Sequence, residues 1–401
     1  MRKGWEYKML GEVCCPKSKI QRATKCFGAS DEIAYIDISS IDNSVQEVNS
    51  ITSFTMSNAP SRAQQKVEYG DIIVSTVRPN LKNVALIKQH DSNLVASSGF
   101  CVLRTTDDIE RNYLFRYITS DIFTQHLMKL TTGANYPAVR DLDVRDSTIP
   151  LPPKSTQLAI VSELDKINEL IRLKKEQLKD FDNLAQSLFY EMFGDPVENE
   201  KGWEVKKLGE ISSLICNGNT PKGGSEVYVD NGILFLRSQN VWKNRLDLDD
   251  VAFIDEATHK SLKKSALNHY DLLITKTGRV NTENSSLGRT ALFEGEDGSA
   301  NINGHVYLVR LKKGMVHKYV LYILISNSYR ELIRRTCVGG IDKRQLNKNH
   351  IEDFPIIFPP LPLQRLFAQR VEQIEREKSE VQKSIQDLET LLASRMQYWF
   401  E

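Results

Sequence analysis

The chain has 401 residues, 40% of them hydrophobic and 26% charged, and its formal net charge is +1. This length suits two or more domains, and the composition is that of a soluble globular protein. The chain has no apolar run of eighteen residues and no apolar N-terminal leader, so we expect no membrane span, no secretory signal and a cytoplasmic location.

The cysteines and the charge distribution bear on two kinds of site, a metal site and a nucleic-acid surface. None of the six cysteines forms a CxxC pair or stands at zinc-finger spacing from a histidine, so we interpret them as free thiols and predict no metal site. A cluster of Cys14, Cys15 and Cys26 is the weaker alternative. Residues 201–354 hold 23 Lys and Arg against 18 Asp and Glu. A near-neutral chain can still bind nucleic acid through such a locally basic region.

One phrase occurs twice, about half a chain length apart. "GWEYKMLGEV" begins at Gly4 and "GWEVKKLGEI" at Gly202, with seven of ten positions identical. Further pairs follow in the same order: "IAYIDISSI" with "ILFLRSQNV", "YGDIIVSTVR" with "HYDLLITKTGR", and "IPLPPKSTQ" with "IIFPPLPLQ". The offset drifts only from 198 to 207. This pattern indicates a tandem duplication of a unit near 200 residues, long enough for a domain and its connector.

Each copy divides into a mixed part and a long helix. Short β-branched and aromatic runs such as "GDIIVSTV" and "GFCVLR", bounded by turn residues, predict strands, and "RNYLFRYITSDIFTQHLMKL" predicts helix. The fold class is therefore α+β, with antiparallel or mixed strands. We predict a first globular domain at 1–152, a long helix at 153–195, a second globular domain at 196–358 and a second long helix at 359–401.

Both long helices carry a heptad pattern. Their apolar residues recur at alternating steps of four and three, with Lys174 interrupting the first helix and Lys378 and Arg395 the second. Each spans about 38 residues, or about 57 Å. We expect them to pair as a coiled coil that spaces the globular parts, although such a stripe could also pack inside a helical domain or on a partner chain. The predicted seam consists of Ile160, Leu164, Ile167, Ile171, Leu178, Phe181 and Leu188 with Phe367, Val371, Ile374, Val381, Ile385, Leu388 and Leu392.

A search for catalytic motifs gives no candidate catalytic residue. The chain has no GxxxxGK[ST] phosphate loop, no GxSxG elbow, no HExxH helix and no "[DNS]PP[YFW]" tetrapeptide of the kind that amino-methyltransferases carry. "GNTPKGG" at 218–224 has glycines and a lysine in a different order, so we interpret it as a turn-rich loop. An enzyme acting alone is therefore not expected.

Two similar domains on a spacer suit a long ligand with two separated features, such as duplex DNA. Base edges and phosphates are contacted mainly by Arg, Lys, Asn and Gln, and the loops of both copies carry these residues at matched points. The candidate DNA-binding residues are Arg78, Asn80, Lys82, Asn135, Tyr136 and Arg140 in the first copy and Lys222, Arg237, Gln239, Asn240, Lys243, Lys276, Arg279, Asn281, Lys343 and Arg344 in the second.

The chain resembles the specificity subunits of type I restriction-modification systems over nearly its whole length. "GWEVKKLGEI", "GNTPKGGSEVYVDNGILFLRSQNV", "YGDIIVST", "TGANYPAVRDLDVRD" and "IPLPPKSTQLAIVSELDKINELI" carry the resemblance. It implies two target recognition domains, each followed by a long helix, with the helices paired antiparallel. It also implies that each domain reads one half of a bipartite DNA site. The first copy lacks the Gly-x-Thr-Pro turn of the second, and such unlike halves imply an asymmetric site.

The resemblance also implies partners and cofactors. Two methyltransferase subunits would methylate an adenine in each half-site, and motor-endonuclease subunits would complete the complex. S-adenosylmethionine and ATP with Mg would then belong to the partner subunits, and this chain would hold no cofactor. Two alternatives remain open: a coiled-coil scaffold that binds proteins without DNA, and an enzyme with an unrecognised site.

The repeated phrase itself is expected to pack rather than to react. Trp203 and Leu208, matched by Trp5 and Leu10, are its predicted packing anchors. In the second copy the phrase follows the end of the first long helix. We therefore expect the phrase at Gly4 to pack near Trp399, at the end of the second long helix.

Overall fold

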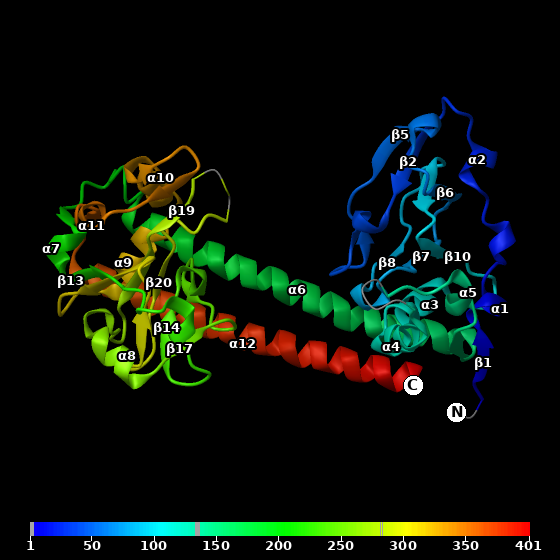
Figure 1. Cartoon of the computed structure of the whole chain (residues 1–401). Helices are drawn as coiled ribbons and strands as arrows, with labels where there is room; N and C mark the ends of the chain where they lie inside the picture. The colour runs from blue at the N-terminus through cyan, green and yellow to red at the C-terminus, as the bar shows by residue number, and fades with distance from the viewer. Residues whose placement is uncertain (1–3, 133–136, 281, 283) are drawn as a thin grey trace. The chain divides into compact units, whose positions relative to one another are not determined.

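A computed structural model describes residues 4–132, 137–280, 282 and 284–401 (Figure 1). The chain forms two compact units, one of Met1–Lys175 with Gln382–Glu401 and one of Glu176–Val381, here called unit 1 and unit 2. The division cuts both long helices. Each unit therefore holds one globular part, the beginning of one long helix and the end of the other.

Unit 1 combines two small sheets with short helices. Its strands are β1 (Glu6–Met9), β2 (Glu32–Ile36), β3 (Ile41–Asp42), β4 (Glu47–Val48), β5 (Thr52–Thr55), β6 (Ala63–Lys66), β7 (Ile72–Ser75), β8 (Val84–Leu86), β9 (Leu94–Ser97), β10 (Phe100–Leu103) and β11 (Thr148–Leu151). Its short helices are α1 (Leu10–Val13), α2 (Ala23–Cys26), α3 (Arg111–Ile118), α4 (Asp121–Leu130) and α5 (Asp141–Arg145). The sheets have the strand orders β5-β2-β9-β6 and β10-β7-β8, and β1 pairs with β11.

Unit 2 repeats this plan. Its strands are β12 (Val205–Lys207), β13 (Ser212–Asn217), β14 (Ile233–Leu236), β15 (Val241–Trp242), β16 (Arg245–Leu246), β17 (Ala252–Ile254), β18 (Leu272–Thr275), β19 (Thr277–Arg279), β20 (Thr290–Leu292), β21 (Ala300–Ile302), β22 (Val306–Leu311), β23 (Val338–Gly339), β24 (Lys343–Gln345) and β25 (Pro355–Ile357). Its short helices are α7 (Leu208–Ile211), α8 (Glu256–Ser261), α9 (His317–Leu324), α10 (Asn327–Thr336) and α11 (Lys348–Glu352).

The tandem repeat predicted from the sequence is confirmed in the strand pairing. The strand β2 runs parallel to β9, and β14 runs parallel to β21, while the other ladders are antiparallel. The repeated phrase forms β1 and α1 in one unit and β12 and α7 in the other. In both units its strand pairs with the strand that precedes the long helix, which closes the globular part on itself.

A buried ion pair also recurs in both units. Asp71 accepts two hydrogen bonds of 2.8 Å from Arg104, and Asp271 accepts bonds of 2.9 and 2.7 Å from Arg310. Both aspartates are 1% exposed and begin the segment that leads into the central strand of their sheet. The two parallel hydrogen bonds satisfy the hydrogen-bonding needs of each buried carboxylate. They explain why both copies have Asp directly before an apolar strand.

The long helices are α6 (Lys154–Phe193) and α12 (Leu361–Phe400). Within unit 1, Lys175 of α6 pairs with Glu389 of α12 at 2.8 Å, and Glu163 pairs with Arg395. Within unit 2, Lys378 pairs with Asp182 at 2.5 Å. Numbers rise along one helix as they fall along the other, so the two helices pack antiparallel. The predicted fold class is confirmed.

The predicted seam lies on the packed faces of these helices. Ile160, Leu164, Ile167 and Ile171 are buried, as are Phe367, Val371, Ile374, Val381 and Ile385, while the remaining seam residues are half-buried. The heptad pattern missed Phe189, Phe193 and Phe400, which are nearly fully buried. These three side chains pack into the globular cores beside Tyr319 and Tyr113. The end of each helix is thus a core element of a globular part.

The repeated phrase packs as expected. Trp5 stacks on Trp399 with the ring centres 6.3 Å apart, which confirms that the phrase at Gly4 lies at the end of α12. In unit 2, the indole of Trp203 donates a 2.9 Å hydrogen bond to the carbonyl of Phe193, at the end of α6. Leu10 and Leu208 are completely buried. The phrase is therefore a joint between a globular part and the end of a long helix.

The described residues contain no candidate membrane span and no candidate metal site. Among them, no helix combines the length and the apolar character needed to cross a lipid bilayer. In the same part of the chain, no three His, Cys, Asp or Glu side chains form a group that could hold a metal ion. All six cysteines are free thiols.

Candidate nucleic-acid interface

In unit 2 the structure brings together two basic loops that are far apart in the sequence. The strand β19 pairs with β24 so that Arg279 lies opposite Lys343, and β24 also pairs with β23. The guanidinium of Arg279 is 67% exposed and forms an ion pair of 3.3 Å with Asp342. Lys343 is also exposed. This three-stranded sheet therefore presents adjacent cations to solvent.

The corresponding loops meet in unit 1 as well. The backbone N–H of Arg78 donates a 2.7 Å hydrogen bond to the carbonyl of Pro137, and Val77 bridges Ala138. Arg78 has a φ of 49° at the start of the turn over 79–81, a backbone conformation that costs energy in non-glycine residues. The hydrogen bond to Pro137 therefore ties this turn to the loop before Arg140.

The other candidates of unit 1 differ in exposure and in their ion-pair partners. Lys82 forms an ion pair of 2.6 Å with Asp121, whereas Asn80 is exposed. Arg140 is 77% exposed and pairs with Asp143 at 2.6 Å. Hydrogen bonds from Arg140 lower the pKa of the Asp143 carboxyl below its usual range. Asn135 and Tyr136, like Asn281 in unit 2, lie outside the described residues.

The turn "RSQN" in unit 2 is structural. Asn240 is only 2% exposed, and its amide donates bonds of 2.9 Å to the carbonyls of Asp247 and Asp250. Its side-chain oxygen accepts a hydrogen bond from the backbone N–H of Arg237. The polar groups of Asn240 thus hold the turn, and contact of this residue with DNA stays a prediction.

The neighbours of Asn240 are partly engaged in the same turn. The guanidinium of Arg237 donates a 2.7 Å bond to the carbonyl of Asp250, and its Nε is buried without a partner among the described residues. The amide of Gln239 donates a 2.6 Å bond to the Asp250 carboxylate, although Gln239 itself is exposed. Of this group, only Gln239 keeps an exposed side chain that could contact a ligand.

The remaining candidates of unit 2 differ in exposure: Lys222 is exposed, whereas Lys276 and Arg344 are half-buried. Lys222 is exposed in the loop before β14, and the ammonium of Lys276 lies 5.8 Å from the ring centre of Tyr307. The guanidinium of Arg344 approaches the carbonyl of Arg334, on α10, at 3.4 Å. Arg344 is half-buried, so its guanidinium supports the β24 strand beside Lys343. The sequence placed Arg279 in a different loop from Lys343 and Arg344, and the fold brings the two loops together.

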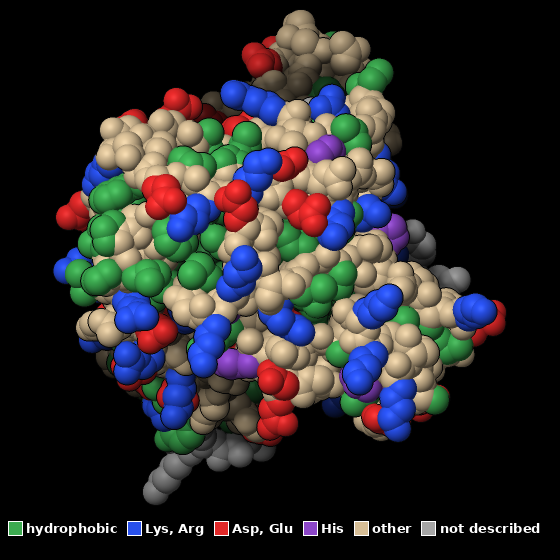
Figure 2. All heavy atoms as spheres, turned by 90° about the vertical axis from the view of Figure 1, so that its left-hand side faces the viewer, with side chains coloured by type: hydrophobic (Ala, Val, Ile, Leu, Met, Phe, Trp, Pro, Cys, Tyr) green, Lys and Arg blue, Asp and Glu red, His purple; other side chains and the backbone are tan. Residues whose placement is uncertain are grey.

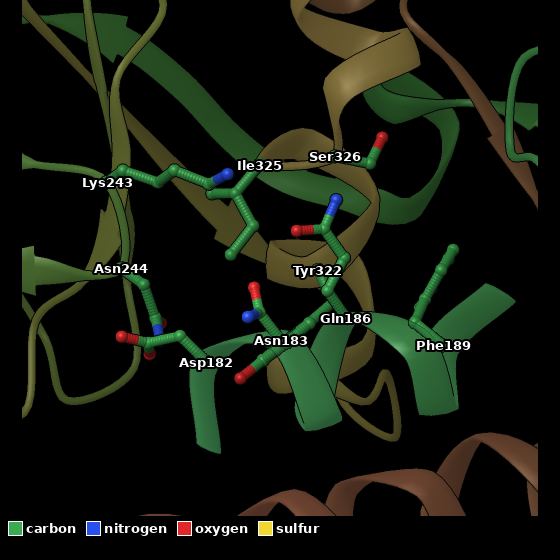
Figure 3. Close-up of a pocket in the computed structure, with 9 residues that line it drawn as sticks. All are labelled: Asp182, Asn183, Gln186, Phe189, Lys243, Asn244, Tyr322, Ile325 and Ser326. Carbon is green, nitrogen blue, oxygen red and sulfur yellow. The ribbon is translucent and has the colours of Figure 1, made fainter. Parts of the chain in front are cut away.

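Lys243 lies at the edge of a pocket of about 300 Å³. Figure 3 shows Asp182, Asn183 and Gln186 entering this pocket from α6, while Lys243 extends toward it from the β15–β16 hairpin. Burial of the ammonium, followed by the positive charge of Arg330, lowers the pKa of Lys243, and Asp182 opposes this shift. A nearby anion would stabilise the charged form of a lysine in this environment.

Sequence reasoning missed a polar groove in unit 1. This groove, of about 810 Å³, lies between the segment around α2 and the sheet strands β6 and β10. Its polar lining comprises Lys17, Ser18, Gln21, Arg22, Lys25, Gln64, Gln65, Thr76, Ser98 and Asp141. Thr76 and Asp141 connect it directly to the loops of Arg78 and Arg140. The run "PKSKIQRATK", with four cations in ten residues, was the available signal.

Positive and negative side chains are mixed over one face of the molecule (Figure 2). Figure 2 shows the face at the left of Figure 1, where unit 2 lies, with Lys and Arg side chains interspersed with Asp and Glu. This agrees with the net charge of +1. Any binding of nucleic acid must therefore depend on the loops and clusters described above rather than on bulk charge.

Comparison with protein families gives a match over most of the chain. A family model described as "Type I restriction modification DNA specificity domain" matches residues 2–180 and again residues 200–390. The type I restriction enzyme MjaIX specificity subunit of Methanocaldococcus jannaschii is 26% identical over 318 residues, which cover 75% of this chain and 70% of that protein. The EcoKI specificity subunit of Escherichia coli K12 is 22% identical, with 78% and 69% covered.

Solved structures give the same match. A chain from work described as the structural basis of complex assembly and conformational transition of the type I R-M system is 27% identical, with a TM-score of 0.68; the match covers 99% of this chain and 97% of that one. The HsdS subunit from Thermoanaerobacter tengcongensis is also 27% identical, with a TM-score of 0.50 over 100% of this chain and 97% of that one. The type I S subunit from M. genitalium, at 14% identity and a TM-score of 0.52, shares the fold over 99% and 96% of the two chains.

Proposed function

The chain belongs to the type I restriction-modification DNA specificity family, and from this premise we propose that it reads an asymmetric bipartite duplex DNA site, with one half-site for each globular part. The pairing of basic loops in both units is the observation that carries the proposal. Arg279 lies opposite Lys343 in unit 2, and the loop of Arg78 meets the loop before Arg140 in unit 1. Two matched sites of this kind suit two half-sites.

The unlike surroundings of the two loop pairs support an asymmetric site. In unit 1 the loops adjoin the polar groove that contains Arg22, Lys25 and Gln64. In unit 2 they rest on the sheet of β19, β24 and β23. Long polar side chains can read base edges in the major groove, and different sets of them select different bases. The two units would therefore select different half-sites.

In this proposal the chain itself is not catalytic. Two modification subunits would transfer a methyl group from S-adenosylmethionine to an adenine in each half-site, and motor-endonuclease subunits would use ATP with Mg for restriction. The present chain would select the DNA and hold the partners on it. No residue of the chain is assigned a catalytic or cofactor-binding role.

A binding experiment with the assembled complex tests this function. The chain would be combined with its modification subunits and mixed with a pool of random duplexes at physiological salt, and the bound duplexes would be sequenced. We expect enrichment of one motif made of two unlike halves with a fixed gap. Equal recovery of all sequences, with the subunits assembled, would contradict sequence reading and would favour a scaffold role.

A further inference from the structure

Positive charge gathers around one indole ring in unit 2. The guanidinium of Arg289 lies 3.8 Å from the ring centre of Trp242, on β15, and that of Arg245 lies 5.4 Å from it. Lys243 follows Trp242 in the chain. Partial burial is the main cause that lowers the pKa of both Lys243 and Arg289, and the charge of Arg330 on α10 adds to it. Lys243, Arg245, Arg289 and Trp242 are here called the Trp242 cluster.

The cluster is not neutralised from within. Among the described residues, Lys243, Arg245 and Arg289 have no carboxylate at ion-pair distance, and Arg289 donates instead to the carbonyls of Asn284 and Ser285. Asp182 is the carboxylate that acts on Lys243, but it pairs with Lys378 at 2.5 Å. Stacking on an indole and bonding to carbonyls fix guanidinium groups in place while leaving their charge uncompensated. Such a site favours an anion.

The matched positions of unit 1 show that the fold does not need this charge. The β15–β16 hairpin corresponds to β3–β4, where Asp42 pairs with Glu47 in place of Trp242 with Arg245. Residue Asn43 then corresponds to Lys243. The strand ladders place Asn83 at the position of Arg289. The formal charge of the four positions is therefore +3 in unit 2 and −2 in unit 1.

The Trp242 cluster is continuous with the basic strands β19 and β24. Arg289 is bonded to the loop of Asn284 and Ser285, which begins after Arg279. A DNA backbone that lies on the loops around Arg279 can therefore extend past Asn284 and Ser285 to the cluster.

We propose that Lys243, Arg245 and Arg289 hold phosphates of duplex DNA beside the half-site read by unit 2, and that unit 1 has no equivalent contact. This inference rests on the proposed function. Phosphate contacts fix the position of a protein on DNA and carry no sequence information directly. Unit 2 therefore anchors the complex on the DNA backbone, whereas unit 1 depends more on its groove and loops.

The test uses the full chain assembled with its modification subunits. One variant carries Lys243→Gln and Arg245→Gln, since both residues are exposed overall although the Lys243 ammonium is partly buried. A matched control carries Lys260→Gln and Lys313→Gln, which remove the same charge from exposed positions of unit 2 outside the cluster. Binding is measured over a series of KCl concentrations, on a duplex of arbitrary sequence and on one that carries the site enriched by the wild-type complex.

The salt dependence gives a quantitative expectation. Each phosphate contact contributes about −0.9 to the slope of log K against log salt, so loss of two contacts makes the slope less steep by about 1.8. Both duplexes should lose affinity by the same factor, and the control should match wild type. A slope unchanged from the control would overturn the proposal.

Two other outcomes would also overturn the proposal. If preference for one half-site changed, these residues would read bases rather than phosphates. If the modification subunits dissociated while assembled complexes kept wild-type DNA affinity, the cluster would be a protein interface. Failure of the proposed function is visible separately, since the wild-type complex would then bind both duplexes equally.

Discussion

Asp71 and Asp271 show how much a single buried residue contributes at matched points of the two units. Each carboxylate is 1% exposed and accepts a two-bond fork from an arginine. The hydrogen bonds with Asp271, ahead of the opposing effect of burial, raise the pKa of Arg310. Removing one partner of such a pair leaves a desolvated charge, which is costly. The pairs therefore lock the central strands against their neighbours.

Asp271→Ala is expected to lower the free energy of unfolding of unit 2 by about 2–3 kcal/mol, less than for a fully buried pair because the Arg310 side chain is 28% exposed. The measurement is urea denaturation followed by tryptophan fluorescence, to which Trp203 and Trp242 contribute from unit 2. Asp230→Ala, at an exposed position, is the control and should change the free energy by less than about 0.5 kcal/mol. Equal stability of the two variants would show that the ion pair contributes nothing.

Lys343→Ala is expected to affect DNA recognition at one half-site only. If Lys343 contacts a base edge, the change costs about 1–3 kcal/mol of discrimination at one position of the half-site read by unit 2. The measurement is sequencing of duplexes bound by the assembled variant, compared with Lys313→Ala as the control. Altered preference in both half-sites would contradict separate reading by the two units.

The sequence predicted where candidate residues lie better than it predicted what their side chains contact. Residue types and their repetition located Arg279 and Lys343, which the fold brings together. They could not separate Asn240 from Gln239, because turn-forming and ligand-binding amides look alike until their partners are known. Trp242 and Arg289 were missed, since 46 intervening residues separate them in the chain and only the hairpin and the β20 strand bring them together.

The long helices were the most predictable elements. The heptad steps identified Ile167 and Ile385 as packed residues, because a helix must bury its apolar face at a fixed period. The pattern failed at Phe189, Phe193 and Phe400, where the helix end faces a globular core instead of its partner helix. A heptad template describes only the helix–helix face, so contacts with a second surface fall outside it.

Ile385→Ala is expected to destabilise unit 1 by about 2–4 kcal/mol, because the 2% exposed side chain would leave a cavity between α6 and α12. The measurement is thermal or urea unfolding. Leu391→Ala, on the same helix but 45% exposed, is the control and should cost less than about 0.5 kcal/mol. If both variants were equally stable, the seam assignment would be wrong.

For the whole molecule, the ordered repetition of motifs predicted the duplication and the α+β class. The groove of unit 1 could not be predicted, because its lining joins residues near Arg22, Gln64 and Ser98 that only the tertiary fold brings together. The charge difference at the Trp242 cluster also required the structure. The sequence alone pairs Ile41 with Val241 at the start of β3 and β15, whereas the match of Asn83 with Arg289 follows only from the strand ladders.

A length change tests whether the helices set the gap between half-sites. One heptad would be duplicated after Leu178 of α6 and another after Val381 of α12, at the level where these helices face each other. The insertion keeps the packed faces in phase and adds about 10 Å, or about three base pairs. Sequencing of the bound duplexes should show a longer gap with both half-sites unchanged. A changed half-site with an unchanged gap would contradict the spacer role.

Methylation-aware sequencing of DNA from a methylation-free host tests the central claim most directly. The host would express the modification subunits with this chain, and in a parallel culture without it. The proposed function predicts methylated adenines in both halves of one asymmetric bipartite motif, only where the chain is present. The same methylation without the chain, or methylation at a single undivided motif, would contradict it.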